Sequence, residues 1–85
     1  MAIEMLYFAW VREQIGTGHE VITPSSAVAS VADLIDWLAA TSDGHARAFA
    51  DRTRLRAAID QKFVALDASI AGAREIAIFP PVTGG

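Results

Sequence analysis

The sequence predicts an α+β domain in which a mixed sheet of about five strands packs on one main helix. Three observations lead to this class. The chain has 85 residues, which is enough for one core and too few for two. Short segments rich in β-favouring residues lie near both ends and again in the second half. One segment with clear helical periodicity lies between them.

The first two strands are predicted from residues 3–10 and 19–23. Aromatic and β-favouring residues dominate segment 3–10, and both of its faces are apolar after Glu4. We therefore expect a central strand that is buried, at least in part, on both faces. Residues 12–15 interrupt the pattern and residues 16–18 supply turn chemistry. A hairpin is the simplest connection between the two strands.

The main helix is predicted to begin after Ser30. This serine is a good N-cap, and Asp33 occupies the third helical position, where a carboxylate suits the positive helix end. Asp33 and Asp36 fall on the wet side, and Trp37 is expected to cover an edge of the core. The helix should stop near residues 41–44. The predicted apolar stripe consists of Val31, Leu34, Ile35 and Leu38.

The second half of the chain contains shorter elements. In chain order we expect a short helix at 45–50, a solvated loop at 51–54, and strands at 55–59, 63–65 and 75–79. Phe49 should face inward from the short helix. Pro80 and Pro81 end the last strand because neither can donate to a ladder. A mixed sheet wrapped on one helix satisfies this order, which is the β-grasp arrangement of ubiquitin.

Composition excludes several functional classes. The absence of cysteine rules out a disulfide framework, a thiolate metal site and a cysteine nucleophile. A net charge of −3, with only seven Lys and Arg, argues against binding to nucleic acid. No apolar run approaches the ~20 residues that span a membrane, and Glu4 stands where a signal peptide is basic. We expect a small, acidic, soluble, cytoplasmic domain.

Other polar residues offer little sign of catalysis. His19 and His45 lie far apart in sequence, without a carboxylate cluster at metal-ligand spacing, so surface or packing roles and no metal site are expected. A loose basic run is expected to be a solvated surface, with a contact patch for an acidic partner as the alternative. This run consists of Arg47, Arg52, Arg54 and Arg56.

The C-terminal segment is the candidate site. Pro80 and Pro81 stiffen its base, and Gly84 and Gly85 have no side chains, so the end can thread a narrow channel of another protein. The α-carboxylate of Gly85 can be activated with ATP as an acyl-adenylate, from which a nucleophile displaces AMP. Terminal glycines also occur as ends without function. Their position just after a strand of a ubiquitin-like pattern favours a flexible acyl arm, so we divide the chain into a domain, 1–81, and a tail, 82–85.

Over essentially its whole length, the chain resembles the family of molybdopterin synthase small subunits, also called molybdopterin converting factor subunit 1. Segment 6–16, LYFAWVREQIG, is similar to the first strand and turn of the family. Segment 75–85, EIAIFPPVTGG, is similar to its ending and is the more specific of the two. Residues 58–61 fall where the family has a strand running into an Asn-Gln turn. Asp60 replaces the usual Asn, and residues 71–75 replace a more acidic turn.

The resemblance implies a sulfur carrier without catalytic activity of its own and with no bound cofactor. An activating enzyme of the ubiquitin-activating type would use ATP to adenylate the Gly85 carboxylate, which would become a thiocarboxylate. The large subunit of the synthase, in a heterotetramer, would accept the tail. Sulfur would pass there to cyclic pyranopterin monophosphate and form the molybdopterin dithiolene of the molybdenum cofactor.

Residues near the tail are expected to contact these partners. Phe79, Pro80 and Pro81 form, with Val82, an apolar base that should pack on the large subunit. Val82, Thr83 and Gly84 would thread its channel. Arg12, followed by Glu13, either helps to dock the activating enzyme or forms an ordinary surface ion pair.

Two other functions stay open at this point. One is a β-grasp sulfur carrier of another pathway, such as thiamine synthesis or tRNA thiolation, which shares the Gly-Gly end. The other is a ubiquitin-like interaction or modifier domain, which would bind a partner or be conjugated to lysine without any sulfur.

Overall fold

The computed structural model describes residues 2–81 and folds them into a five-stranded sheet with helices on one side. In chain order the elements are β1 (Ile3–Tyr7), α1 (Ala9–Ile15), β2 (His19–Ile22), α2 (Val31–Ala39), α3 (Asp43–Ala48), a 3₁₀ turn (Arg52–Arg54), β3 (Arg56–Ile59), β4 (Lys62–Val64) and β5 (Glu75–Phe79). The predicted tail, 82–85, lies outside the described residues, so the division at residue 81 stays a prediction.

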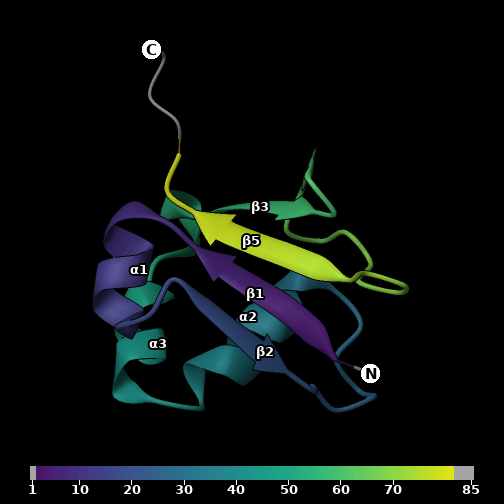
Figure 1. Cartoon of the computed structure of the whole chain (residues 1–85), viewed down its shortest axis with the longest axis horizontal. Helices are drawn as coiled ribbons and strands as arrows, with labels where there is room; N and C mark the ends of the chain where they lie inside the picture. The colour runs from purple at the N-terminus through teal and green to yellow at the C-terminus, as the bar shows by residue number, and fades with distance from the viewer. Residues whose placement is uncertain (1, 82–85) are drawn as a thin grey trace.

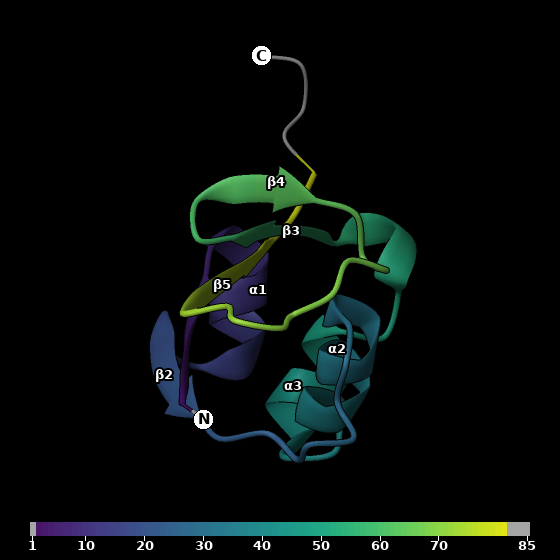
Figure 2. The same ribbon diagram turned by 90° about the vertical axis from the view of Figure 1, so that its right-hand side faces the viewer.

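The strands are arranged in the order β2-β1-β5-β3-β4 (Figure 1). The first and last strands of the chain, β1 and β5, run parallel at the centre, and the other neighbours are antiparallel. In the view turned by 90°, α2 and α3 lie to one side of β2, β1 and β5 (Figure 2). The predicted mixed sheet of five strands packed on one main helix is therefore confirmed.

The core lies between α2 and the covered face of the sheet. Ile3, Met5 and Tyr7 alternate along β1 and are almost fully buried. The predicted stripe of α2 is at most 1% exposed at every position, and it consists of Val31, Leu34, Ile35 and Leu38. Trp37 is half-buried against this core, as predicted. Burial of this apolar surface is the main force that holds the helix on the sheet.

The start of α2 follows the predicted capping pattern. The Ser30 hydroxyl accepts a hydrogen bond from the Asp33 amide at 3.1 Å, and the Asp33 carboxylate accepts one from the Ser30 amide at 3.2 Å. Two otherwise unpaired amides are satisfied in this way. Amide donation from Ala29 and Ser30 lowers the pKa of the Asp33 carboxyl. Asp33 and Asp36 are exposed, as predicted.

The connection between β1 and β2 differs from the prediction. The predicted strand 3–10 ends at Tyr7, and residues 9–15 form a helix, α1, instead of a simple hairpin connection. Phe8 has extended backbone angles at the N-cap. Gly16 adopts φ 97° at the other end, and its amide donates to the Arg12 carbonyl at 2.8 Å. A left-handed glycine of this kind commonly ends a helix.

The later elements are close to their predicted positions. β5 has the predicted bounds, and β3 and β4 lie within one residue of theirs. The region predicted only as the end of the main helix also begins the next one, because Ser42 caps α3. α3 therefore starts two residues earlier than predicted, and Phe49 is 2% exposed, as expected. The predicted loop at 51–54 contains the 3₁₀ turn.

Candidate functional site

The face of the sheet opposite the helices carries an apolar row across four strands. The register places Leu6 of β1 beside Ala77 of β5. Ala77 is beside Ala58 of β3, which is beside Phe63 of β4. The expectation of a central strand that is buried, at least in part, on both faces is met fully on the covered face and only in part on this one. Leu6 is only half-buried there, because the helices of residues 2–81 lie on the other side of the sheet (Figure 2).

This row forms the floor of an open groove with a volume of about 810 Å³. Ala58 and Ala77 are small and almost fully buried, and larger side chains line the groove beside them. Phe63 is 81% exposed, and its ring centroid lies 5.7 Å from that of Phe79. A continuous exposed apolar surface of this kind marks a site of interaction.

Three of the predicted interface residues line the groove. Phe79 is the last residue of β5, and Pro80 and Pro81 follow it along the same groove. All three are half-buried. The described part of the chain therefore ends in the groove, at Pro81. The roles of Val82, Thr83, Gly84 and Gly85 lie outside the described residues and stay predictions.

Arg12 lies elsewhere. It belongs to α1, is exposed, and does not line the groove. A Cβ built on Gly18 would lie 3.2 Å from both Cδ and Nε of Arg12, so this side chain passes close to the turn before β2. The ion pairs of residues 2–81 do not include one between Arg12 and Glu13. The structure thus does not bring Arg12 together with the other predicted interface residues.

Leu6, Phe8 and Phe63 also line the groove and were not predicted as parts of the site. The signal was present in segment 3–10, whose two faces are both apolar, but it was interpreted as burial. A strand that is apolar on both faces is covered either by its own chain or by a partner. For Leu6, the described residues provide no such cover, and the groove is the result.

The turn at the other end of the groove explains the Asp60 departure. Asp60 and Gln61 have φ values of 48° and 72° and make the tight connection between β3 and β4. Two positive φ angles are typical of a two-residue hairpin turn. The Asp60 carboxylate accepts hydrogen bonds from the amides of Arg74 and Glu75 at 3.1 and 2.9 Å. The turn therefore uses this side chain as an acceptor, a role that Asp fills as well as Asn.

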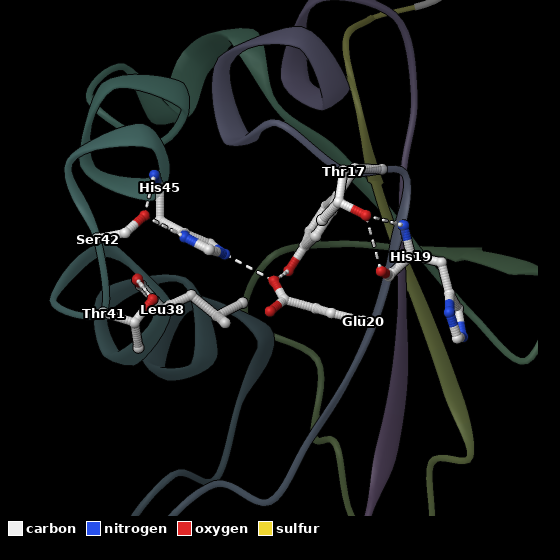
Figure 3. A network of polar contacts seen from close by, with 8 residues as sticks. Thr17, His19, Glu20, Leu38, Thr41, Ser42 and His45 are labelled. Carbon is white, nitrogen blue, oxygen red and sulfur yellow. Dashed lines mark hydrogen bonds and ion pairs between the residues drawn. The ribbon is translucent and has the colours of Figure 1, made fainter.

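A second polar feature lies inside the fold, between β2 and α3 (Figure 3). One carboxylate oxygen of Glu20 accepts from the Tyr7 hydroxyl at 2.7 Å and lies 2.6 Å from His45 Nε2. The other ring nitrogen of His45 lies 2.6 Å from the Ser42 hydroxyl. A serine, a histidine and a carboxylate in one chain of contacts invite comparison with a catalytic triad.

The surroundings of this network indicate a structural role. The Ser42 hydroxyl also accepts from the His45 amide at 3.1 Å and so caps α3. His45 is 8% exposed and packs edge-on against Tyr7. The packing role predicted for His45 is confirmed, and His19 is on the surface. The network connects α3 to β1 and β2 and so holds this helix against the sheet.

Burial also changes the acidity of Tyr7. Its side chain is 1% exposed, and loss of hydration raises the pKa of the phenol well above its ordinary value. The hydrogen bond to Glu20 and the negative charge of that carboxylate raise the pKa further. An ionised phenol would have to sit beside a carboxylate in a poorly hydrated place, so the folded protein keeps the neutral form.

Within residues 2–81, no cluster of three or more His, Asp or Glu side chains is placed to hold a metal ion. None of the helices in this range has the length and apolar character needed to cross a membrane.

The parallel pairing of the terminal strands and the helix crossing one face define a ubiquitin-like β-grasp domain. The model of the ThiS family matches residues 5–85, and the chain belongs to this family. Two similar relatives are both described as "Molybdopterin synthase sulfur carrier subunit". The one from Escherichia coli K12 is 40% identical and the one from Haemophilus influenzae 35%, each over 98% of this chain and 99% of its own.

A similar solved structure supports the fold. The crystal structure of SAMP1 from Haloferax volcanii has a TM-score of 0.71 to this chain, with 26% identity and complete coverage of both chains. The family resemblance of segments 6–16 and 75–85 and the predicted β-grasp fold are therefore both confirmed.

Proposed function

We propose that the chain is the sulfur carrier subunit of a molybdopterin synthase, in molybdenum cofactor biosynthesis, with no catalytic machinery of its own. The two relatives with this description match it over nearly their full length. The structural observation that carries the proposal is the apolar groove at the base of the C-terminal segment, where Phe79, Pro80 and Pro81 line it. A partner that seats in this groove is placed to receive the segment that follows.

The chemistry takes place at Gly85. Its carboxylate attacks the α-phosphate of ATP on an activating enzyme, which forms an acyl-adenylate and releases pyrophosphate. Sulfide released by a sulfur donor then attacks the acyl carbon and displaces AMP, which leaves a thiocarboxylate. On the large subunit this sulfur passes to cyclic pyranopterin monophosphate, and water replaces it at the acyl carbon, which restores the Gly85 carboxylate. Because a dithiolene contains two sulfur atoms, each product requires two loaded carriers.

The narrow end of the chain suits this transfer. Gly84 and Gly85 add no side chains, so a partner can enclose the reacting carbonyl closely. Val82 and Thr83 connect the glycines to the proline pair and thread the channel. The large subunit packs on the groove in a heterotetramer, and the activating enzyme of the ubiquitin-activating type uses ATP. The carrier works in the cytoplasm.

The test of this chemistry is mass spectrometry of the intact protein. After incubation with the activating enzyme, ATP and a sulfur donor, the mass should rise by the difference between one sulfur and one oxygen, at Gly85. Deletion of Gly85 should abolish both this gain and molybdopterin formation and leave the circular dichroism spectrum unchanged. An isopeptide-linked product would instead identify a protein modifier. A deletion variant that still supports molybdopterin formation would refute the mechanism.

Binding to the large subunit tests the groove. Phe63→Ser should weaken binding by about 10-fold or more. The substitution removes a largely exposed aromatic ring that the large subunit would bury in the complex. Val21→Ser is the matched control, since Val21 is 57% exposed and does not line the groove. Equal affinities of the two variants would exclude the groove as the interface. A carrier with intact sulfur loading and no affinity for the large subunit would belong to another pathway.

A further inference from the structure

The positive charge of the chain is concentrated in one short segment. Residues 47–56 contain four arginines and one aspartate and carry a net charge of +3. The net charge of the whole chain is −3, so all other residues together carry −6. Separation of charge on this scale creates a local positive potential on an otherwise acidic protein.

Two of these arginines are already engaged within the domain. Arg52 pairs with the carboxylate of Asp36 on α2. Arg56 donates from one guanidinium nitrogen to the carbonyl oxygens of Thr53 and Leu55, at 3.2 and 2.8 Å. Arg52 thus attaches the 3₁₀ turn to α2, and Arg56 stabilises the end of this turn.

The other two arginines border a hollow of about 400 Å³ between α1 and the end of α3. The guanidinium carbon of Arg54 lies 4.9 Å from the ring centroid of Trp10, which is a cation–π contact. Arg47 Nε donates to the side-chain oxygen of Gln14 at 3.4 Å. Both arginines are exposed, and α1 orients both. Each guanidinium has five N–H donors, and these contacts occupy few of them.

One carboxylate lies in the same hollow. Asp51 accepts hydrogen bonds from the amide and the hydroxyl of Thr53, at 3.0 and 2.6 Å. These bonds, and to a smaller extent the charge of Arg54, lower the pKa of Asp51. The Asp51 oxygen is therefore directed to Thr53, and the hollow, lined by two cations and one anion, keeps a positive balance.

We propose that the hollow formed by Trp10, Arg47 and Arg54 binds an acidic segment of the large subunit and extends the groove interface. The proposal rests on the function proposed above. Planar guanidinium groups match carboxylates in a two-point geometry, and Trp10 offers an apolar surface for the rest of the side chain. Phe8 and Ala9 line the groove and Trp10 lines the hollow, so three consecutive residues connect the two sites.

The chemistry of the surroundings selects a protein partner. A nucleic acid presents a long row of phosphates, and the −6 charge of the remaining residues repels such a polyanion. A short acidic segment of a protein bound on the groove meets only the local positive potential. Charge pairing at the edge of an apolar interface speeds association and fixes orientation.

The test is a titration of the large subunit at low and high salt. Arg47→Gln with Arg54→Gln should weaken binding about 5- to 10-fold at low salt and much less at high salt. Arg54→Gln alone should give a smaller loss, and Arg74→Gln, which removes an exposed charge outside the hollow, should stay within about 2-fold. Thermal unfolding of each variant confirms that these surface changes leave the fold intact.

The outcomes distinguish a failure of this inference from a failure of the proposed function. Unchanged affinity and unchanged salt dependence in the double variant would refute the hollow as a contact, even where Phe63→Ser abolishes binding. A large subunit that does not bind the native chain would refute both the proposed function and this inference. A glutamate-rich peptide should compete for binding, and an oligonucleotide that competes better would assign the hollow to nucleic acid and overturn the proposal.

Discussion

Tyr7→Phe gives two opposite effects at two pH values, and the structure sets the size of each. Near neutral pH the variant loses the 2.7 Å bond from the buried Tyr7 hydroxyl to the partly exposed carboxylate of Glu20. A bond of this kind to a charged acceptor contributes about 1–2 kcal/mol, because Glu20 keeps its contact with His45 and partial access to water. The variant should therefore be less stable than the native protein by that amount.

At alkaline pH the difference should reverse. In the unfolded chain Tyr7 ionises at about pH 10. In the folded protein, burial and Glu20 raise the pKa of the Tyr7 phenol above that value. Above this pH the unfolded state has released a proton that the folded state still holds, so the free energy of unfolding falls by up to about 1.4 kcal/mol per pH unit. Phenylalanine has no such proton. The stability curves of the two proteins should cross at about pH 10.5–11.5.

Urea unfolding across this range measures both effects, and ultraviolet absorbance of the phenolate adds a direct test. The chain contains one tyrosine, so the absorbance reports Tyr7 alone. Phenolate should appear only as the far-ultraviolet circular dichroism of the native fold is lost. Ionisation at about pH 10 in a fully folded protein, or two stability curves that stay parallel, would refute the reasoning.

Two further predictions concern the helices. Gly44→Ala places a Cβ 2.6 Å from the Gln14 carbonyl oxygen, so α3 must shift from α1. Urea unfolding should show a loss of about 1–3 kcal/mol in spite of the better helix propensity of alanine. Ala46→Gly measures this propensity difference separately in the same helix. A gain in stability for Gly44→Ala would contradict the close contact. Ser30→Ala removes the cap of α2 and should lower the free energy of unfolding by about 1 kcal/mol. Ser26→Ala, at an exposed serine, is the control. Equal losses in the two variants would show that the cap contributes nothing.

The elements that the sequence predicts well are those whose pattern is local. The α2 helix has its cap and its apolar stripe within nine residues of Ser30, and all of these positions have the predicted burial. β5 is a short β-favouring run that two prolines end, and its bounds agree with the structure. In both cases the residues that specify an element are the residues within it and next to it.

The α1 helix was missed because its determinants are not local. Phe8 makes no side-chain cap, and Ala9 has φ 52°, a conformation that alanine rarely adopts. Val11 is fully buried, and Gly44 of α3 lies against the last turn of α1. These contacts join residues about thirty positions apart. Gly16 was the one local sign of a helix end, and it also fits a turn between two strands.

The candidate site was predictable at its base and not on its floor. Pro80 and Pro81 follow a predicted strand directly, so their place at its end could be derived. That Leu6, Ala58 and Phe63 share one surface depends on the strand register, which no segment contains by itself. The last step, that this apolar face stays open, depends on where the helices pack.

An open apolar face has a cost that its neighbours reduce. Phe63 lies on an edge strand, and an exposed edge with an aromatic residue favours aggregation. β4 is only three residues long and begins with Lys62, both of which limit pairing with another strand. A fold that needed this face only for stability would do better with polar residues there. The apolar groove is therefore best explained by reversible docking, which the proposed function requires because the activating enzyme and the large subunit would act in turn on the carboxylate of Gly85.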